Sequence, residues 1–289
     1  MSRVDTPLPQ LRGALQTTRT DRWWLQPLLT FLGLGAFIVY STWAALQGVH
    51  YFTPGTHYLS PMYSPVLFDS WQVGEQGLRS GHAWFGPWPD WLPRTMLFLP
   101  LTPAFLILWA PGGFRFTCYY YRGAYYKAFW GDPSACAVGE PGFRGKRFRG
   151  EQKFPLILQN IHRYFFYVAV LFIFVLTYDA LLAYTFPTHG EGGKEGWSLG
   201  IGVGSLVLTI NPILLGGYTF GCHSFRHLIG GRKDHLSKLG AKKKAYDCAS
   251  CLNRRHMLFA WLSLFWVGFT DFYVRMCSMG VFRDLHVIF

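Results

Sequence analysis

Cysteine and histidine residues recur at the ends of the apolar segments of this chain. They are Cys118, Cys136, His162, Cys222, His223, His227, Cys248, Cys251 and His256. Thiolates and imidazoles are the protein ligands that zinc and iron–sulfur centres use. The charge pattern described below assigns all of these positions to the same side of a membrane. Their common depth therefore predicts a metal centre at that side.

Several kinds of metal centre fit this set of residues. The Cys248-x2-Cys251 and His223-x3-His227 motifs have spacings that a structural zinc site can use. An isolated cysteine at a membrane edge more often packs as a small apolar residue. A gathering of thiols and imidazoles instead favours a Rieske-type [2Fe–2S] centre, in which two thiolates hold one iron and two imidazoles hold the other.

A b-type haem is the rival cofactor. It needs two imidazoles that face each other inside a helical bundle. No predicted span has a histidine near its middle, and only His162 and His256, at the ends of two spans, can form such a pair. Haem is therefore the weaker prediction.

The elements that must position these residues are transmembrane helices. The chain has 289 residues, of which 51% are hydrophobic and only 15% are charged. About 20 apolar residues cross the hydrocarbon core of a bilayer. Five segments approach this length: Trp24 to Leu46, Trp91 to Ala110, Tyr164 to Phe186, Trp197 to Phe220 and Met257 to Val274. The sequence therefore predicts an all-α integral membrane bundle of about five transmembrane helices.

The distribution of charge predicts the orientation of this bundle. The net charge of +12 comes from basic residues in the N-terminal tail, in residues 111–155 and in residues 221–255, whereas residues 47–90 carry few. Basic residues concentrate in cytoplasmic loops. We therefore expect a multi-pass protein of the plasma membrane, with residues 1–22 as a cytoplasmic arm, 111–155 and 221–255 as cytoplasmic loops, and 47–90 as an external cap on a single bundle of residues 23–289. Nucleic acid is not an expected partner.

Five sequence blocks resemble the membrane-anchor subunit of actinobacterial succinate dehydrogenases. They are residues 114–122, 135–138, 158–165, 222–227 and 252–257. The chain lacks histidines in the middle of its predicted helices, and in this respect it resembles a haem-free branch of these anchors. The resemblance implies a subunit of a respiratory-chain and tricarboxylic-acid-cycle enzyme that takes electrons from flavoprotein and iron–sulfur subunits and passes them to a quinone. A higher oligomer of the complex is compatible with it. The chain alone would not oxidise succinate.

The resemblance also reduces the set of candidate metal ligands and implies a quinone site. It disfavours Cys248 and Cys251, and it favours a metal set of Cys118, Cys136, Cys222, His223 and His227 for a Rieske-type [2Fe–2S] centre. Menaquinone or another quinone needs an apolar slot at the membrane edge with hydrogen-bond donors. The candidates for that slot are His162, Arg163, Tyr164, Trp130, Arg226 and His256. Interfacial anchoring is the alternative role of the tyrosine, the tryptophan and Arg163.

Two carboxylates lie inside predicted spans, where ionisable groups are costly and often functional. Asp271 has Arg275 four residues further on, a spacing that predicts an ion pair on one helix face. Asp179 lies in the outer third of its span and is a candidate for a proton path or a second quinone site. A transporter with a structural zinc site is an alternative of another class, but the spans contain few polar residues that could line a path.

Overall fold

The computed structural model describes residues 21–72, 82–129, 157–189, 195–231 and 235–289. The chain divides into two compact units. One comprises Met1–Ala36 and Arg115–Asn160, and the other comprises Phe37–Phe114 and Ile161–Phe289. Each unit is described by itself below.

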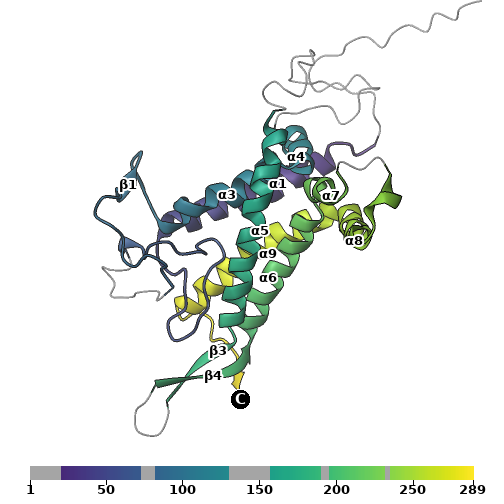
Figure 1. Cartoon of the computed structure of the whole chain (residues 1–289). Coiled ribbons are helices and arrows are strands. Elements are labelled where there is room, and N and C mark those ends of the chain that lie inside the picture. The colour runs from purple at the N-terminus through teal and green to yellow at the C-terminus, as the bar shows by residue number, and fades with distance from the viewer. Residues whose placement is uncertain (1–20, 73–81, 130–156, 190–194, 232–234) are drawn as a thin grey trace, which may run out of the picture. The chain divides into compact units, whose positions relative to one another are not determined.

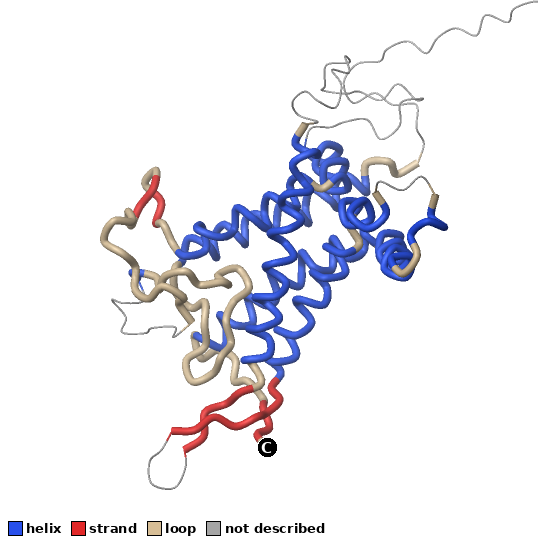
Figure 2. The backbone as a smooth tube through the Cα atoms, in the orientation of Figure 1, coloured by secondary structure: helices blue, strands red, loops and turns tan. Residues whose placement is uncertain are grey.

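Four helices of the described residues are long and apolar enough to cross a membrane. They are α1 (Leu25–Gln47), α5 (Leu158–Leu182), α6 (Val203–Phe220) and α9 (His256–Ser278). Figure 2 draws these and the other helices in blue. Four of the five predicted spans are therefore confirmed, with small shifts of their ends.

The predicted span from Trp91 to Ala110 is wrong in its bounds. Its first half contains two short paired strands, β1 (Thr95–Met96) and β2 (Leu99–Pro100). Helix α3 (Pro103–Thr117) begins only at Pro103, a position that suits proline because the first helical N–H needs no partner. With 15 residues, α3 is about 22 Å long, which is shorter than the hydrocarbon core.

The start of the fourth predicted span is also extended chain. Strand β4 (Glu195–Gly202) lies between β3 (Thr185–His189) and β5 (His286–Ile288) in an antiparallel sheet, and α6 follows it directly. Apolar residues such as Trp197 and Leu199 thus belong to a strand that projects beyond the helices (Figure 1). Hydropathy alone cannot separate such a strand from the helix that it precedes.

The two segments expected as cytoplasmic loops contain helices. Residues 111–129 hold the end of α3 and all of α4 (Tyr119–Phe129). Residues 221–255 hold α7 (His223–Gly230), the 3-10 turn η2 (Leu236–Leu239) and α8 (Lys242–Arg254). Helix α7 packs against α8, and α6 packs along α9 (Figure 1).

A close approach of helix backbones holds α6 against α9. A Cβ atom built on Gly217 of α6 would lie 2.5 Å from ring carbons of Phe259 on α9. Only glycine leaves room for that ring. Small residues allow the same close packing between membrane helices in general.

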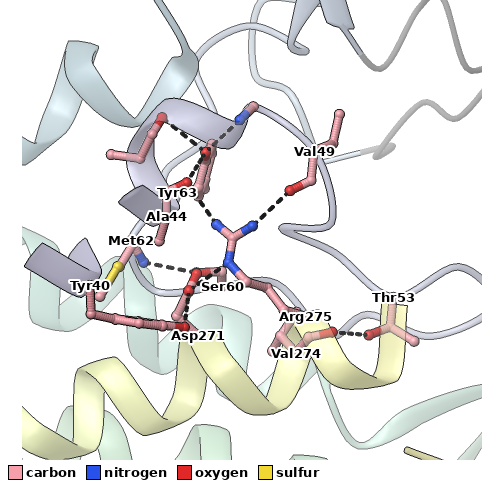
Figure 3. Close-up of polar contacts among 12 residues, drawn as sticks. Tyr40, Ala44, Val49, Thr53, Ser60, Met62, Tyr63, Asp271, Val274 and Arg275 are labelled. Atoms are coloured by element: carbon pink, nitrogen blue, oxygen red, sulfur yellow. Dashed lines mark hydrogen bonds and ion pairs between the residues drawn. The ribbon is translucent and has the colours of Figure 1, made fainter. Parts of the chain in front are cut away.

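A buried network of charged and polar groups ties α9 to α1 and to the segment after α1 (Figure 3). Asp271 accepts hydrogen bonds from Tyr40 (2.7 Å), from Ser60 and from Arg275 (2.7 Å). The Arg275 guanidinium also donates to the carbonyl oxygens of Ala44 (2.8 Å) and Val49 (3.0 Å). Both charged side chains are almost fully buried. The predicted ion pair between Asp271 and Arg275 is thereby confirmed.

The segment after α1 forms an apolar cluster together with the end of α1 and the start of α3. Its buried members are Ala44, Ala45, Tyr51, Phe52, Leu59, Met62, Tyr63, Val66 and Ala104. The rings of Tyr51 and Tyr63 stack with their centroids 4.5 Å apart. This packing gives residues 49–66 a defined structure although they contain no helix or named strand.

Candidate metal centre

A histidine and a cysteine that are 60 residues apart in the chain meet at one end of the larger unit. The Nε2 atom of His162, in the second turn of α5, lies 2.9 Å from the Sγ atom of Cys222. Cys222 follows the end of α6 and caps α7, because its sulfur accepts a hydrogen bond from the backbone N–H of Ser224 at 3.4 Å. Both side chains are buried, with 6% and 2% of their surface exposed. The contact therefore joins two metal-binding groups away from solvent.

Aromatic rings surround this pair and connect it to a second imidazole. Phe114 stacks on His162, with ring centroids 4.5 Å apart and an angle of 8° between the planes. Tyr218 stacks in the same way on His256, at 4.9 Å and 18°. Phe114 and Tyr218 meet edge to face at 5.4 Å. His256 and, to a smaller extent, His223 are also close enough to interact electrostatically with His162. The imidazoles of His162 and His256 and the thiol of Cys222 thus share a largely apolar environment, and His223 lies within electrostatic reach of it.

Two glycines allow the elements that carry these residues to approach. A Cβ atom on Gly113 of α3 would overlap the ring of Phe165 on α5, next to the Phe114–His162 stack. A Cβ atom on Gly221 would lie 3.1 Å from the carbonyl oxygen of Leu252. The side-chain amide of Asn253 donates to the Gly221 carbonyl at 2.7 Å, which fixes the turn that presents Cys222.

The other two predicted histidine ligands pair with each other. The Nε2 atoms of His223 and His227, one helical turn apart on α7, are separated by 2.8 Å. Both side chains are exposed. Partial burial, together with the neighbouring His227 and Arg226, lowers the pKa of His223 and favours its neutral form. Within the described residues, no three His, Cys, Asp or Glu side chains lie in an arrangement that could hold a metal ion.

The remaining cysteines differ in their surroundings. Cys118 lies between α3 and α4, in the smaller unit, and is buried. Only three residues separate it from Phe114, so the two Cα atoms are at most about 14 Å apart. Cys248 and Cys251 are exposed on α8. Cys136 lies outside the described residues.

Of the predicted quinone residues that the structure describes, only His162 and the half-buried His256 belong to the cluster around Cys222. Arg163 and Tyr164 are exposed on α5, with the guanidinium 5.6 Å from the tyrosine ring centroid. The guanidinium of Arg226 bonds to α8, through Asn253 at 3.1 Å and Tyr246 at 3.1 Å. These hydrogen bonds hold α7 against α8. Trp130 lies outside the described residues.

The smaller unit contains a hollow. Its volume is about 570 Å³, and it is lined by residues at the start of α1 and on α4, among them Arg22, Trp23, Tyr119, Tyr120 and Lys127. This size is typical of small-molecule sites. Arg22 and Trp23 precede a span, so their pattern in the sequence resembles ordinary interfacial anchoring. The hollow is lined by aromatic and basic residues at the start of a membrane helix.

The intramembrane carboxylate Asp179 has a local partner as well. It lies near the end of α5, is 7% exposed, and accepts a hydrogen bond from Ser64. This contact links α5 to the segment after α1. A role in a proton path or a second quinone site stays a prediction.

Comparison with known proteins agrees with this architecture. Residues 25–280 match the family model for the actinobacterial succinate dehydrogenase subunit SdhC. A chain from the solved structure of the Mycobacterium smegmatis Sdh1 complex in the apo form is 45% identical, with a TM-score of 0.76 and with 96% of each chain covered. A search of curated proteins gave no match. Since the family model covers most of the chain and four helices can cross a membrane, the chain belongs to the actinobacterial SdhC family, the membrane-anchor subunits of succinate dehydrogenase.

Proposed function

We propose that this anchor subunit holds a Rieske-type [2Fe–2S] centre, through which electrons pass from an iron–sulfur subunit to a membrane quinone. The observation that carries the proposal is the buried contact between His162 Nε2 and Cys222 Sγ at 2.9 Å. Mixed thiolate and imidazole ligation distinguishes Rieske-type centres from all-cysteine clusters.

The donors near this contact fit the ligand requirement of such a centre. Two thiolates and two imidazoles are needed. Cys222 and His162 supply one of each, and His256 is the second imidazole of the same cluster. We assign Cys118 as the second thiol because it is buried and follows Phe114 by four positions in the sequence. His223 and His227 are replaced in this assignment, since they contact each other on an exposed helix face.

The protein residues around the donors would set their properties. When bound, a [2Fe–2S] centre supplies a one-electron relay, and imidazole ligands raise its potential. The stacks of Phe114 on His162 and of Tyr218 on His256 hold both rings in fixed planes. These aromatic side chains also exclude water from the donors. Environment and ring orientation of this kind tune a metal centre beyond its direct ligands.

The remaining parts of the proposal concern the partners and the quinone. The solved relative is a chain of a succinate dehydrogenase complex. By this likeness, we infer that flavoprotein and iron–sulfur subunits deliver electrons to this chain. The quinone, menaquinone or a related one, would bind at the membrane edge beside His162 and His256. Arg163 and Tyr164 follow His162 on α5 and are exposed, so they can contact a ligand that arrives from the lipid.

Electron paramagnetic resonance of the reduced, purified complex tests the ligand assignment. We expect a signal of low average g value, typical of mixed Cys and His ligation, that is lost in Cys222→Ser, Cys118→Ser and His162→Ala. His227→Gln is the matched control and should keep the signal, because His227 faces His223 instead of Cys222. A signal that survives Cys222→Ser and His162→Ala would refute the assignment.

An absorption spectrum separates the proposal from the haem alternative. A b-type haem held by His162 and His256 would give sharp reduced Soret and α bands in a ratio of one haem per anchor subunit. We expect no such stoichiometric bands. Their presence, together with their loss in His256→Ala, would replace the iron–sulfur centre by haem in this subunit.

A further inference from the structure

The exposed face of α7 carries two histidines in a geometry that suits a metal chelate. His223 and His227 are four residues apart, which places their side chains on one face of the helix. Their ring centroids are 4.3 Å apart, and the two Nε2 atoms point at each other across 2.8 Å. Neither ring is needed for the buried cluster around Cys222 in the function proposed above.

The distance between the two nitrogen atoms is close to that of a bidentate zinc ligand pair. Zinc binds imidazole nitrogen at about 2.0–2.1 Å with tetrahedral angles, so two such ligands stand roughly 3.3 Å apart. The Nε2 atoms would therefore move apart by about 0.5 Å to admit the ion. Exposed side chains make a shift of this size by small rotations about their χ angles. Water can fill the remaining coordination positions because both rings are exposed.

The charged group nearest in the chain does not block this face. Arg226 lies between the two histidines in sequence, but its guanidinium nitrogens bond to Asn253 and Tyr246 of α8. Its guanidinium is thus anchored on α8, although its charge still reaches His223. We propose that His223 and His227 form a binding site for a divalent transition-metal ion, and that the bound ion clamps the first turns of α7.

Zinc binding to the intact complex tests this site. After dialysis against buffered Zn²⁺, we expect His223→Gln and His227→Gln to bind one zinc ion less per anchor subunit than the wild type. Loss of one of two direct ligands should weaken binding at least tenfold, since even outer-sphere partners of a metal site contribute 10–100-fold. His235→Gln is the matched control, because His235 is exposed without a second histidine one turn away.

The exposed thiols of α8 are the competing zinc ligands in this part of the chain. A Cys248→Ser/Cys251→Ser variant should keep the zinc ion if the histidines hold it. Loss of zinc in that variant, or an unchanged zinc content in both histidine variants, would overturn the proposal.

Hydrogen exchange distinguishes a chelate from a single ligand. An ion that joins positions four residues apart stabilises the helix between them, so zinc should slow amide exchange in residues 223–230 of the wild type. The two histidine variants should show no such protection. Bound zinc without any change in exchange at α7 in the wild type would also refute the chelate.

Discussion

The ion pair between Asp271 and Arg275 should make a large contribution to stability, and a matched pair in the same chain allows the contribution to be measured. Lys243 and Asp247 have the same spacing of four residues and a similar distance, 2.9 Å against 2.7 Å. The exposed fractions are 57% for both partners of one pair, but 2% and 0% for Arg275 and Asp271. The two pairs therefore differ in burial and in the further hydrogen bonds that Asp271 and Arg275 make.

Replacement of Arg275 by Met leaves the Asp271 carboxylate buried without its countercharge. The carboxylate keeps its bonds from Tyr40 and Ser60, while the Val49 carbonyl loses the donor that Arg275 supplies. Breaking a buried pair in this way costs about 3–5 kcal/mol. Replacement of Lys243 by Met should cost about 0.3–0.5 kcal/mol, as for other exposed helix pairs.

Thermal unfolding of this subunit in the purified complex measures the difference between the stability losses of the two variants. We expect Arg275→Met to lower the midpoint by roughly 6–20 °C, and Lys243→Met to shift it by at most about 2 °C. Adding Asp271→Asn to Arg275→Met removes the unpaired charge and should recover at least about 1 kcal/mol of the loss. Equal shifts for the two single variants, or no recovery in the double variant, would refute the electrostatic explanation.

Three further results follow from the packing, the ionisation and the predicted orientation. Gly217→Ala should destabilise the subunit by about 1–3 kcal/mol because the added Cβ overlaps an α9 ring, whereas Gly216→Ala, whose Cβ would meet no atom closer than 3.8 Å, should be tolerated in thermal unfolding. Burial lowers the pKa of His82 to about 4, so between about pH 6.5 and pH 4 the unfolded chain binds more protons than the folded chain. The stability should therefore fall as the pH drops through this range. The unfolding midpoint of His82→Gln should fall less over the same range. An impermeant maleimide should label the exposed thiols of Cys248 and Cys251 in inverted vesicles only, and labelling in right-side-out vesicles instead would reverse the predicted topology.

The sequence predicted the membrane helices well because a span needs about 20 apolar residues and little else. The predicted spans are wrong where apolar residues lie in strands or loops instead of helices. Trp197 and Leu199 are as hydrophobic as the helix that follows them, but they pair in β4 with strands from both sides. Pro100 and Pro103 lie at the true boundary before α3, inside the segment that hydropathy predicts as one span.

The sequence indicates cysteine and histidine as the residue types of the candidate site, but only in part which of these residues lie together. Local spacing indicates a pair such as His223 and His227, since four residues make one helical turn. The contact of His162 with Cys222 depends on how α5, α6 and α7 pack, and no local spacing encodes it. The one available signal was position: both residues lie at ends of spans assigned to the same membrane side.

The network of Figure 3 also has a consequence for the order of events during synthesis. Tyr40 and the Asp271 that accepts its hydrogen bond are 231 residues apart in sequence. A chain made from its N-terminus inserts α1 long before α9 leaves the ribosome. Until then the Ala44 and Val49 carbonyls lack their guanidinium donor. Residues 49–66 therefore reach their final packing only when α9 inserts, so a nascent chain stalled before α9 should expose this segment to proteases and chaperones.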